Sequence, residues 1–182
     1  MTDTLPILRG TAVTLRPLPG DEAHGFAEAL AVDTGARPWL GSDPAVIERW
    51  ITAGEVSAFV VWDGNDPVGL ITFEEQTDPD YFSANIDIAL LSRGTGRGLG
   101  PDAIRALAGW LFSVRGHHRI TIDPAVANER SIRAYRKVGF RPVGVMRRYE
   151  RTPGGEWHDN LLMDMLAEDL TGSEGHTAPP RV

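Results

Sequence analysis

The chain has 182 residues, 42% of them hydrophobic, which fits one globular domain with a sizeable core. Its 25 acidic and 18 basic residues give a formal net charge of −7, which argues against nucleic acid as a partner and is compatible with a cationic substrate. Cysteine is absent, which excludes disulfides, thiolate metal sites and cysteine nucleophiles. No basic-then-apolar leader and no membrane-spanning apolar run is present, so we expect a cytoplasmic protein with no membrane partner.

Hydrophobic periodicity and turn residues predict seven strands and four helices in the order β-α-α-β-β-β-α-β-α-β-β. The strands are expected at 11–16, 56–62, 68–73, 82–91, 118–123, 140–149 and 156–166. The helices are expected to begin at Gly20, Pro44, Leu99 and Asn128. Residues 1–8 are expected to be a loose leader and 33–41 a loop. This order predicts one α/β domain around a mixed sheet.

The most informative stretch runs from Ile86 to Asp102 and contains glycine at 94, 96, 98 and 100. It predicts an apolar strand, a glycine-rich loop and a helix that begins at about Leu99. Glycines let backbone N–H groups approach a ligand closely, and a helix N-terminus presents unpaired N–H groups to an anion. The spacing excludes the GxxxxGK[ST] and GxGxxG phosphate loops. A bland alternative is a glycine-rich turn between a strand and a helix.

The segment Arg93-x-x-Gly96-x-Gly98 resembles the acyl-CoA pyrophosphate loop of the GCN5-related N-acetyltransferases (GNAT). A second segment, Asn128-x-x-Ser131-x-x-x-Tyr135-x-Lys137-x-Gly139-Phe140, resembles a motif that follows the loop in the same family. The resemblance extends over residues 9–170, and the tail 171–182 is expected to be disordered. It implies a single-domain GNAT fold with a mixed, mostly antiparallel sheet of about seven strands and four helices on both faces.

The resemblance also implies that acetyl-CoA is the cofactor, that no metal is needed, and that acetyl passes directly to an amine. The positions it assigns to acetyl-CoA binding are Ala89, Leu90, Leu91, Arg93, Gly94, Thr95, Gly96, Arg97, Gly98, Leu99, Gly100, Asn128, Ser131, Tyr135 and Lys137. Asn128 is also expected to be the N-cap of its helix.

Direct transfer requires a base near the amine and an acid near the sulfur. Asp87 is the candidate base, because a carboxylate within an apolar strand is costly unless it has a task. Tyr135 is the candidate acid, since its phenol can donate to the leaving thiolate. The alternative for Asp87 is a strand residue that faces solvent or forms a structural salt bridge. The alternative for Tyr135 is an aromatic residue of the core.

Acceptor binding is assigned to Asp87, Asp123 and Trp39. Asp123 ends a strand just before Pro124, where ligands of α/β sheets usually lie, and could equally cap the next turn. Trp39 lies in a loop that borders the acceptor cleft in the family, and a role as a core residue is an equal alternative. Within the family, the segments around Asp87, Asp123 and Tyr135 look like those of aminoglycoside 6'-N-acetyltransferases, although one residue is missing between Asp87 and Gly96.

Other polar clusters have simpler interpretations. His117 and His118 lack a third metal ligand, and no metal site is expected. The acidic residues at 74, 75, 78 and 80 are expected to form a solvated loop or a rim that attracts a polycation, and His158 is expected to face solvent.

The leading hypothesis is a small-molecule amine acceptor, with the 6'-amine of an aminoglycoside as the specific candidate. A protein N-terminus and a siderophore-type lysine amine are rival acceptors. A non-catalytic acyl-CoA-binding regulatory module is the rival of another class. An exposed edge strand near the C-terminus permits either a monomer or a homodimer.

Overall fold

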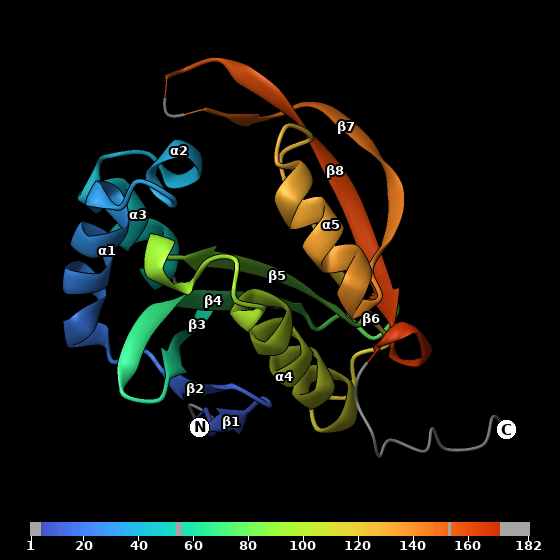
Figure 1. Ribbon diagram of the computed structural model, residues 1–182. Coiled ribbons are helices and arrows are strands. Elements are labelled where there is room, and N and C mark those ends of the chain that lie inside the picture. Colours follow the sequence, from blue (N-terminus) through green and yellow to red (C-terminus); the bar gives the residue numbers. More distant parts are fainter. Residues whose placement is uncertain (1–4, 54–55, 153, 172–182) are drawn as a thin grey trace, which may run out of the picture.

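The computed structural model describes residues 5–53, 56–152 and 154–171, and Figure 1 shows how the elements are arranged. The strands are β1 (Leu8–Arg9), β2 (Val13–Pro17), β3 (Val56–Asp63), β4 (Asp66–Gln76), β5 (Ser83–Leu90), β6 (Arg119–Ile122), β7 (Arg141–Arg151) and β8 (Trp157–Leu166). The helices are α1 (Ala23–Val32), α2 (Arg37–Leu40), α3 (Pro44–Thr52), α4 (Leu99–Ser113) and α5 (Glu129–Val138). Among these helices none is long and apolar enough to cross a membrane.

In the described part of the chain the strands form one sheet in the order β1-β2-β3-β4-β5-β6-β8-β7. The pairing of β5 with β6 is parallel, and the other neighbouring strands pair antiparallel. The predicted mixed, mostly antiparallel α/β fold is therefore confirmed, and the predicted order of elements holds with two additions.

The additions are β1 and α2, so the described residues form a sheet of eight strands instead of about seven, and five α-helices instead of four. Strand β1 lies at the end of the expected leader, where Leu8 pairs with Leu15 and is buried. Helix α2 lies in the expected loop because the Asp33 carboxylate accepts the N–H groups of Gly35 and Ala36 and starts a short turn. One paired dipeptide and one helical turn are too short to give a periodic sequence signal.

The two faces of the sheet carry separate apolar cores. Helices α4 and α5 cover the face that includes Phe59, Phe73 and Ile86, whereas α1 and α3 cover the face that includes Leu70 and Ala89. Because side chains alternate along a strand, Asp87 lies on the same face of β5 as Ala89, the α1–α3 face. Tyr135 lies on α5, on the opposite face of the sheet.

The two faces communicate where β5 and β6 part. Their parallel pairing ends at Asn85 and Thr121, although β5 continues to Leu90. Beyond Ile122 the chain follows β8 instead, since the Leu161 N–H donates to the Pro124 carbonyl. One edge of β5 is thus left without a strand partner from Ile86 to Leu90, and this gap can admit a ligand between the two faces.

Candidate active site

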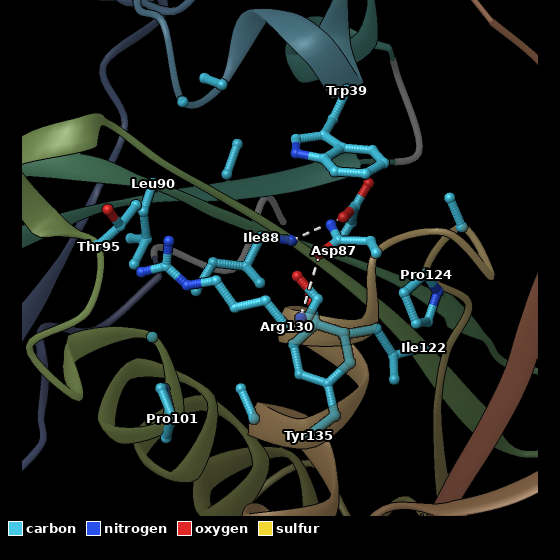
Figure 2. Close-up of a pocket in the computed structure, with 18 of the residues that line it drawn as sticks. Trp39, Asp87, Ile88, Leu90, Thr95, Pro101, Ile122, Pro124, Arg130 and Tyr135 are labelled. Atoms are coloured by element: carbon cyan, nitrogen blue, oxygen red, sulfur yellow. Dashed lines mark hydrogen bonds between the residues drawn. The ribbon is translucent and has the colours of Figure 1, made fainter.

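A cavity of about 520 Å³ occupies the gap between β5 and the end of β6. Its walls come from β5, the glycine loop and the first turn of α4, helix α5, helix α2, the turn after β6, and strands β7 and β8. Figure 2 shows Asp87 between Trp39 on one side and Tyr135 on the other. Residues from 35 to 158 therefore meet in one site.

The glycine loop forms one end of the cavity, here called the cofactor end. Gly96 and Gly98 have φ angles of 78° and 80°, a left-handed region that favours glycine. Gly98 is the N-cap of α4 and has open space around the position where a side chain would begin. The expected start of α4 at Leu99 is confirmed. The first N–H groups of α4 and the positive end of its dipole therefore face the loop, where no side chain covers the backbone. This arrangement suits a phosphate group.

Basic side chains complete the cofactor end, but they are not those of the glycine loop. Arg130, Arg133 and Lys137 of α5 line the cavity. The Arg93 guanidinium instead donates to the Pro67 carbonyl, and Arg97 pairs with a carboxylate of β3 at 2.6 Å. These two arginines brace the loop against the β3–β4 turn, and the positive charge at the cavity comes from the next helix.

The start of α5 fixes the position of Tyr135. The Asn128 side chain accepts the Ser131 N–H at 3.2 Å, which confirms Asn128 as the N-cap. Tyr135, two turns into the helix, packs against Phe140 with ring centroids 6.2 Å apart and lines the cavity. Burial raises the pKa of the Tyr135 phenol, and the Asp87 carboxylate raises it further. The phenol therefore stays protonated at neutral pH and can act as a proton donor.

Asp87 lies on the part of β5 that no longer pairs with β6. Its side chain is open to water from the cavity, yet protein atoms surround it on most sides. This desolvation raises its pKa to about 6, and the negative charges of Asp123, Glu150 and Glu74 add to the shift. The Ile88 N–H opposes the shift by donating to the Asp87 carboxylate at 2.7 Å. A carboxylate with this pKa is well suited to accept a proton at neutral pH.

The other end of the cavity, here called the acceptor end, collects carboxylates from separate strands. Asp123 follows β6 and Glu150 belongs to β7, and both line the cavity with Asp87. The buried Asn160 amide donates to the Asp123 carbonyl at 2.7 Å and to the Glu150 carboxylate at 3.1 Å. Burial raises the pKa of Asp123, and the neighbouring Glu150 charge raises it further. The arrangement is a negative pocket suited to ammonium groups.

Trp39 closes the acceptor end from the α2 side. It is 43% exposed and lines the cavity with Leu40. The alternative of a fully buried core residue therefore does not hold for Trp39. An exposed indole above a group of carboxylates offers an apolar and π-rich surface to a cationic ligand.

The structure brings most of the predicted site residues together around this cavity. Those that line it are Trp39, Asp87, Ala89, Leu90, Gly94, Thr95, Gly96, Gly98, Leu99, Gly100, Asp123, Asn128, Ser131, Tyr135 and Lys137. Arg93 and Arg97 turn away as described above, and Leu91 is buried in the α1–α3 core.

Arg130, Arg133 and Glu150 line the cavity but were not predicted from the sequence. The two arginines lie inside the second motif, seven and four residues before Lys137, so a helical projection could have indicated them. Glu150 had no such signal, because an irregular register between Met146 and Glu150 sets its orientation. His158 also lines the cavity and pairs with Glu150 at 3.4 Å, so the expectation that it faces solvent was wrong.

The remaining polar cluster has a structural role on the far side of β4. Glu75 accepts from Arg115 at 2.7 Å and bonds to the buried His117 ring at 2.6 Å. His118 instead bonds to the Phe82 carbonyl. Glu74, on the opposite side of the strand, adds to the negative potential at Asp87. Of the acidic pair, Glu75 therefore makes a structural contact, whereas Glu74 contributes to the electrostatic surroundings of the site.

Comparison with known proteins agrees with this geometry. Residues 12–141 match the family model described as an acetyltransferase (GNAT) domain. A kanamycin resistance protein of Rhizobium radiobacter is 37% identical over 83 residues, which cover 46% of this chain and 72% of that protein. An aminoglycoside N(6')-acetyltransferase type 1 of Klebsiella pneumoniae is also 37% identical over 83 residues, which cover 46% of this chain and 39% of that protein.

Two solved structures extend the likeness to nearly the whole chain. Mycobacterium smegmatis RimJ in complex with CoA-disulfide has a TM-score of 0.77 at 28% identity, covering 94% of this chain and 90% of that one. AAC(6')-Ib in complex with paromomycin and acetyl-CoA has a TM-score of 0.71 at 22% identity, covering 91% of this chain and 99% of that one; at this identity it shows the shared fold alone. The chain belongs to the GNAT family of acetyltransferases.

Proposed function

We propose that the protein transfers acetyl from acetyl-CoA to a primary amine of a small polycation, specifically the 6'-amine of an aminoglycoside. The observation that carries the proposal is the group of carboxylates at the acceptor end, where Asp87, Asp123 and Glu150 line one cavity. The likeness to a kanamycin resistance protein supports the same acceptor class.

The residues at the cofactor end fit acetyl-CoA. Backbone N–H groups at Gly98–Gly100 and the side chains of Arg130 and Lys137 would hold its phosphates. The free edge of β5 would pair with its extended, amide-containing arm, since in the described part of the chain the edge of β5 that faces β6 has no strand partner beyond Asn85. When bound, acetyl-CoA supplies a thioester carbonyl that is open to attack by an amine.

Asp87 would prepare the amine. An ammonium group bound among the carboxylates gives a proton to an Asp87 oxygen, and the neutral amine keeps its lone pair for attack. The pKa of about 6 lets Asp87 be ionised at pH 7 and still hold a proton briefly before releasing it to water. The Ile88 N–H on the same free edge donates to the Asp87 carboxylate at 2.7 Å and so holds the proposed base in place.

Tyr135 would complete the proton transfers at the other side of the gap. Its hydroxyl gives a proton to the sulfur that leaves as thiolate, and the second proton of the attacking nitrogen restores the hydroxyl. One proton per turnover therefore reaches water, by way of Asp87. The two residues come from opposite faces of the sheet, so the transfer requires the opening between β5 and β6.

The test is an acceptor screen with purified protein and acetyl-CoA, in which thiol release is followed with kanamycin or spermidine. We expect turnover with kanamycin, acetylated at the 6'-amine as shown by mass spectrometry and NMR of the product. If spermidine but not kanamycin were acetylated, the proposed acceptor would be a linear polyamine instead of an aminoglycoside. No turnover with either compound, while calorimetry shows CoA binding, would refute the polycation proposal.

A peptide N-terminus is the second candidate acceptor, because the glycine loop from Arg93 to Gly100 also resembles that of ribosomal-protein acetyltransferases. A peptide carries one α-amino group, whereas the acceptor end presents several carboxylates. A panel of peptides with different N-terminal residues in the same assay separates the two candidates. Turnover of a peptide whose only positive charge is its α-amino group, at a rate higher than that with kanamycin, would favour the second candidate.

A further inference from the structure

A contact between Asp33 and Ser92 joins the two ends of the cavity. Asp33 follows α1, and Ser92 opens the 3-10 turn Ser92–Gly94 that begins the glycine loop. The Ser92 N–H donates to both Asp33 oxygens at 2.9 and 3.0 Å, and the Ser92 hydroxyl donates to Oδ1 at 2.8 Å. One carboxylate thus holds a residue that is 59 positions away in sequence.

The same carboxylate organises its own segment. The N–H groups of Gly35 and Ala36 donate to Asp33 Oδ1 at 2.8 and 3.0 Å, and the Gly35 N–H also lies 3.0 Å from the Ser92 hydroxyl. Burial acts to raise the pKa of Asp33, but the donors from Ser92, Ala36 and Gly35 outweigh it and lower the pKa. Asp33 is therefore ionised at neutral pH, and its hydrogen bonds are charge-assisted.

The close approach of the two segments depends on Gly35. A Cβ at this position would lie 2.9 Å from the Ser92 hydroxyl oxygen and 3.3 Å from Asp33 Oδ1. A side chain at 35 would therefore displace the Ser92 hydroxyl and crowd the Asp33 carboxylate. The contact is packed as well as hydrogen-bonded.

Each side of the contact continues to a residue that lines the cavity. The Ser92 carbonyl accepts the Thr95 N–H and hydroxyl at 3.2 and 2.9 Å, and Thr95 lines the cofactor end. On the other side, the Ala36 carbonyl accepts the Trp39 N–H at 3.0 Å, and Trp39 lines the acceptor end. A short chain of hydrogen bonds therefore leads from Thr95 to Trp39.

We infer that Asp33 is a positioning residue through which cofactor binding at the glycine loop orders the acceptor wall of residues 33–41. A ligand that orders one segment reduces the entropy cost of ordering another segment that is bonded to it. The acceptor then binds more tightly to the CoA complex than to the free protein, and the acceptor strengthens CoA binding by the same factor. The inference rests on the proposed function in that CoA is the ligand of the loop.

The test is hydrogen–deuterium exchange of the full chain with and without CoA, read by mass spectrometry. This readout requires no acetyl transfer, so it is independent of the acceptor. In the wild-type protein we expect CoA to slow exchange both at 92–100 and at 34–41. In Asp33→Ala the protection at 92–100 should remain, which shows that the variant is folded and binds CoA, whereas the protection at 34–41 should disappear.

Three further variants separate coupling from local damage. Gly35→Ala keeps the charge of Asp33 but crowds its contact with the Ser92 hydroxyl, so it should also lose the protection at 34–41. Ser92→Thr keeps the hydroxyl and the N–H and should behave as the wild type. Asp21→Asn changes an exposed carboxylate in the turn before α1 and is the matched charge control, with both protections retained.

Kinetics with kanamycin give a second readout. Loss of the charge-assisted bonds in Asp33→Ala should raise the KM for kanamycin roughly tenfold, with kcat changed less than about twofold. Wild-type protein in which CoA protects 92–100 but not 34–41, or Asp33→Ala that keeps the protection at 34–41, would overturn the inference. Absence of protection at 92–100 in the wild type would instead refute the CoA site, and the proposed function and this inference with it.

Discussion

The cofactor end and the acceptor end of the cavity meet where β5 and β6 part, but they draw on different parts of the chain. The cofactor end consists mainly of backbone from the glycine loop and the first turn of α4, with basic side chains from α5. The acceptor end consists of side chains from β5, β6, β7 and α2. A backbone site tolerates side-chain variation and holds a constant ligand, whereas a site of separate side chains can change its ligand through single substitutions.

Removing the proposed base should have the largest effect. Asp87→Asn should lower kcat about 10²–10⁴-fold with CoA affinity largely kept, since the amide cannot accept the ammonium proton. Steady-state kinetics with kanamycin and calorimetry with CoA measure the two quantities. If turnover were unchanged, a base elsewhere or a water relay would be required, and the acceptor end would serve binding alone.

The pH dependence of the same residue follows from its raised pKa. Activity of the wild type should fall as the pH drops below about 6, because Asp87 becomes protonated. The pH dependence of stability runs in the opposite direction. Because the pKa of Asp87 is higher in the folded state than in the unfolded state, the folded state binds the proton more tightly. The protein therefore loses stability as the pH rises through about 6. Asp87→Asn should therefore raise the melting temperature at pH 8 and change it little at pH 4. A lower melting temperature at pH 8 would indicate a structural ion pair.

Tyr135→Phe should lower kcat about 10²–10³-fold by removing the proton donor to the thiolate, while the ring keeps its packing against Phe140. The matched control is Phe140→Tyr, which adds a hydroxyl to the neighbouring ring of the same contact. CoA binding by Tyr135→Phe should match the wild type. A kcat within about twofold of the wild type would leave Tyr135 a packing residue.

Gly98→Val tests the cofactor end by itself. The residue has a φ of 80°, which a β-branched side chain adopts only with strain, and a side chain there would occupy the open space beside the loop that we assign to CoA. We expect the Kd for CoA to rise about tenfold or more, a loss of roughly 1.4 kcal/mol. Gly109→Val, in the middle of α4 with open space around it, is the control for a general effect on the helix. Equal weakening in both variants would contradict a specific loop effect.

The smallest expected effect concerns Glu150 at the acceptor end. Glu150→Gln should raise the KM for kanamycin about three- to tenfold and leave the Kd for CoA unchanged, since one of several carboxylates loses its charge. Glu156→Gln, an exposed carboxylate beyond the end of β7, is the control. A weaker affinity for CoA in Glu150→Gln would show that the two ends are not separable in the way described.

The fold followed from the sequence where elements are long and periodic. Strand β4, strand β5 and helix α4 have continuous apolar patterns and clear ends, so their type and order were predictable. Strand β1 and helix α2 were missed because a paired dipeptide and a single helical turn are too short to give a periodic pattern. The segment between β1 and β2 also depends on a distant partner, since the N–H groups of residues 11–13 donate to the Asp102 carboxylate, about 90 positions away, at 2.7 to 3.0 Å.

The sequence by itself determined the family, the glycine loop and the position of Tyr135, because loop, helix start and N-cap are local features in which spacing fixes geometry. The tertiary structure decided how the acceptor end is completed around Asp87, Asp123 and Trp39, which the sequence had indicated. Glu150 lines the acceptor end because the register of β7 is irregular, and Arg97 pairs with a carboxylate of β3 and does not line the cavity. Asp87 and Tyr135 line one cavity from opposite faces of the sheet because β5 and β6 part. These outcomes depend on strand pairing over long sequence separations, which no local pattern encodes.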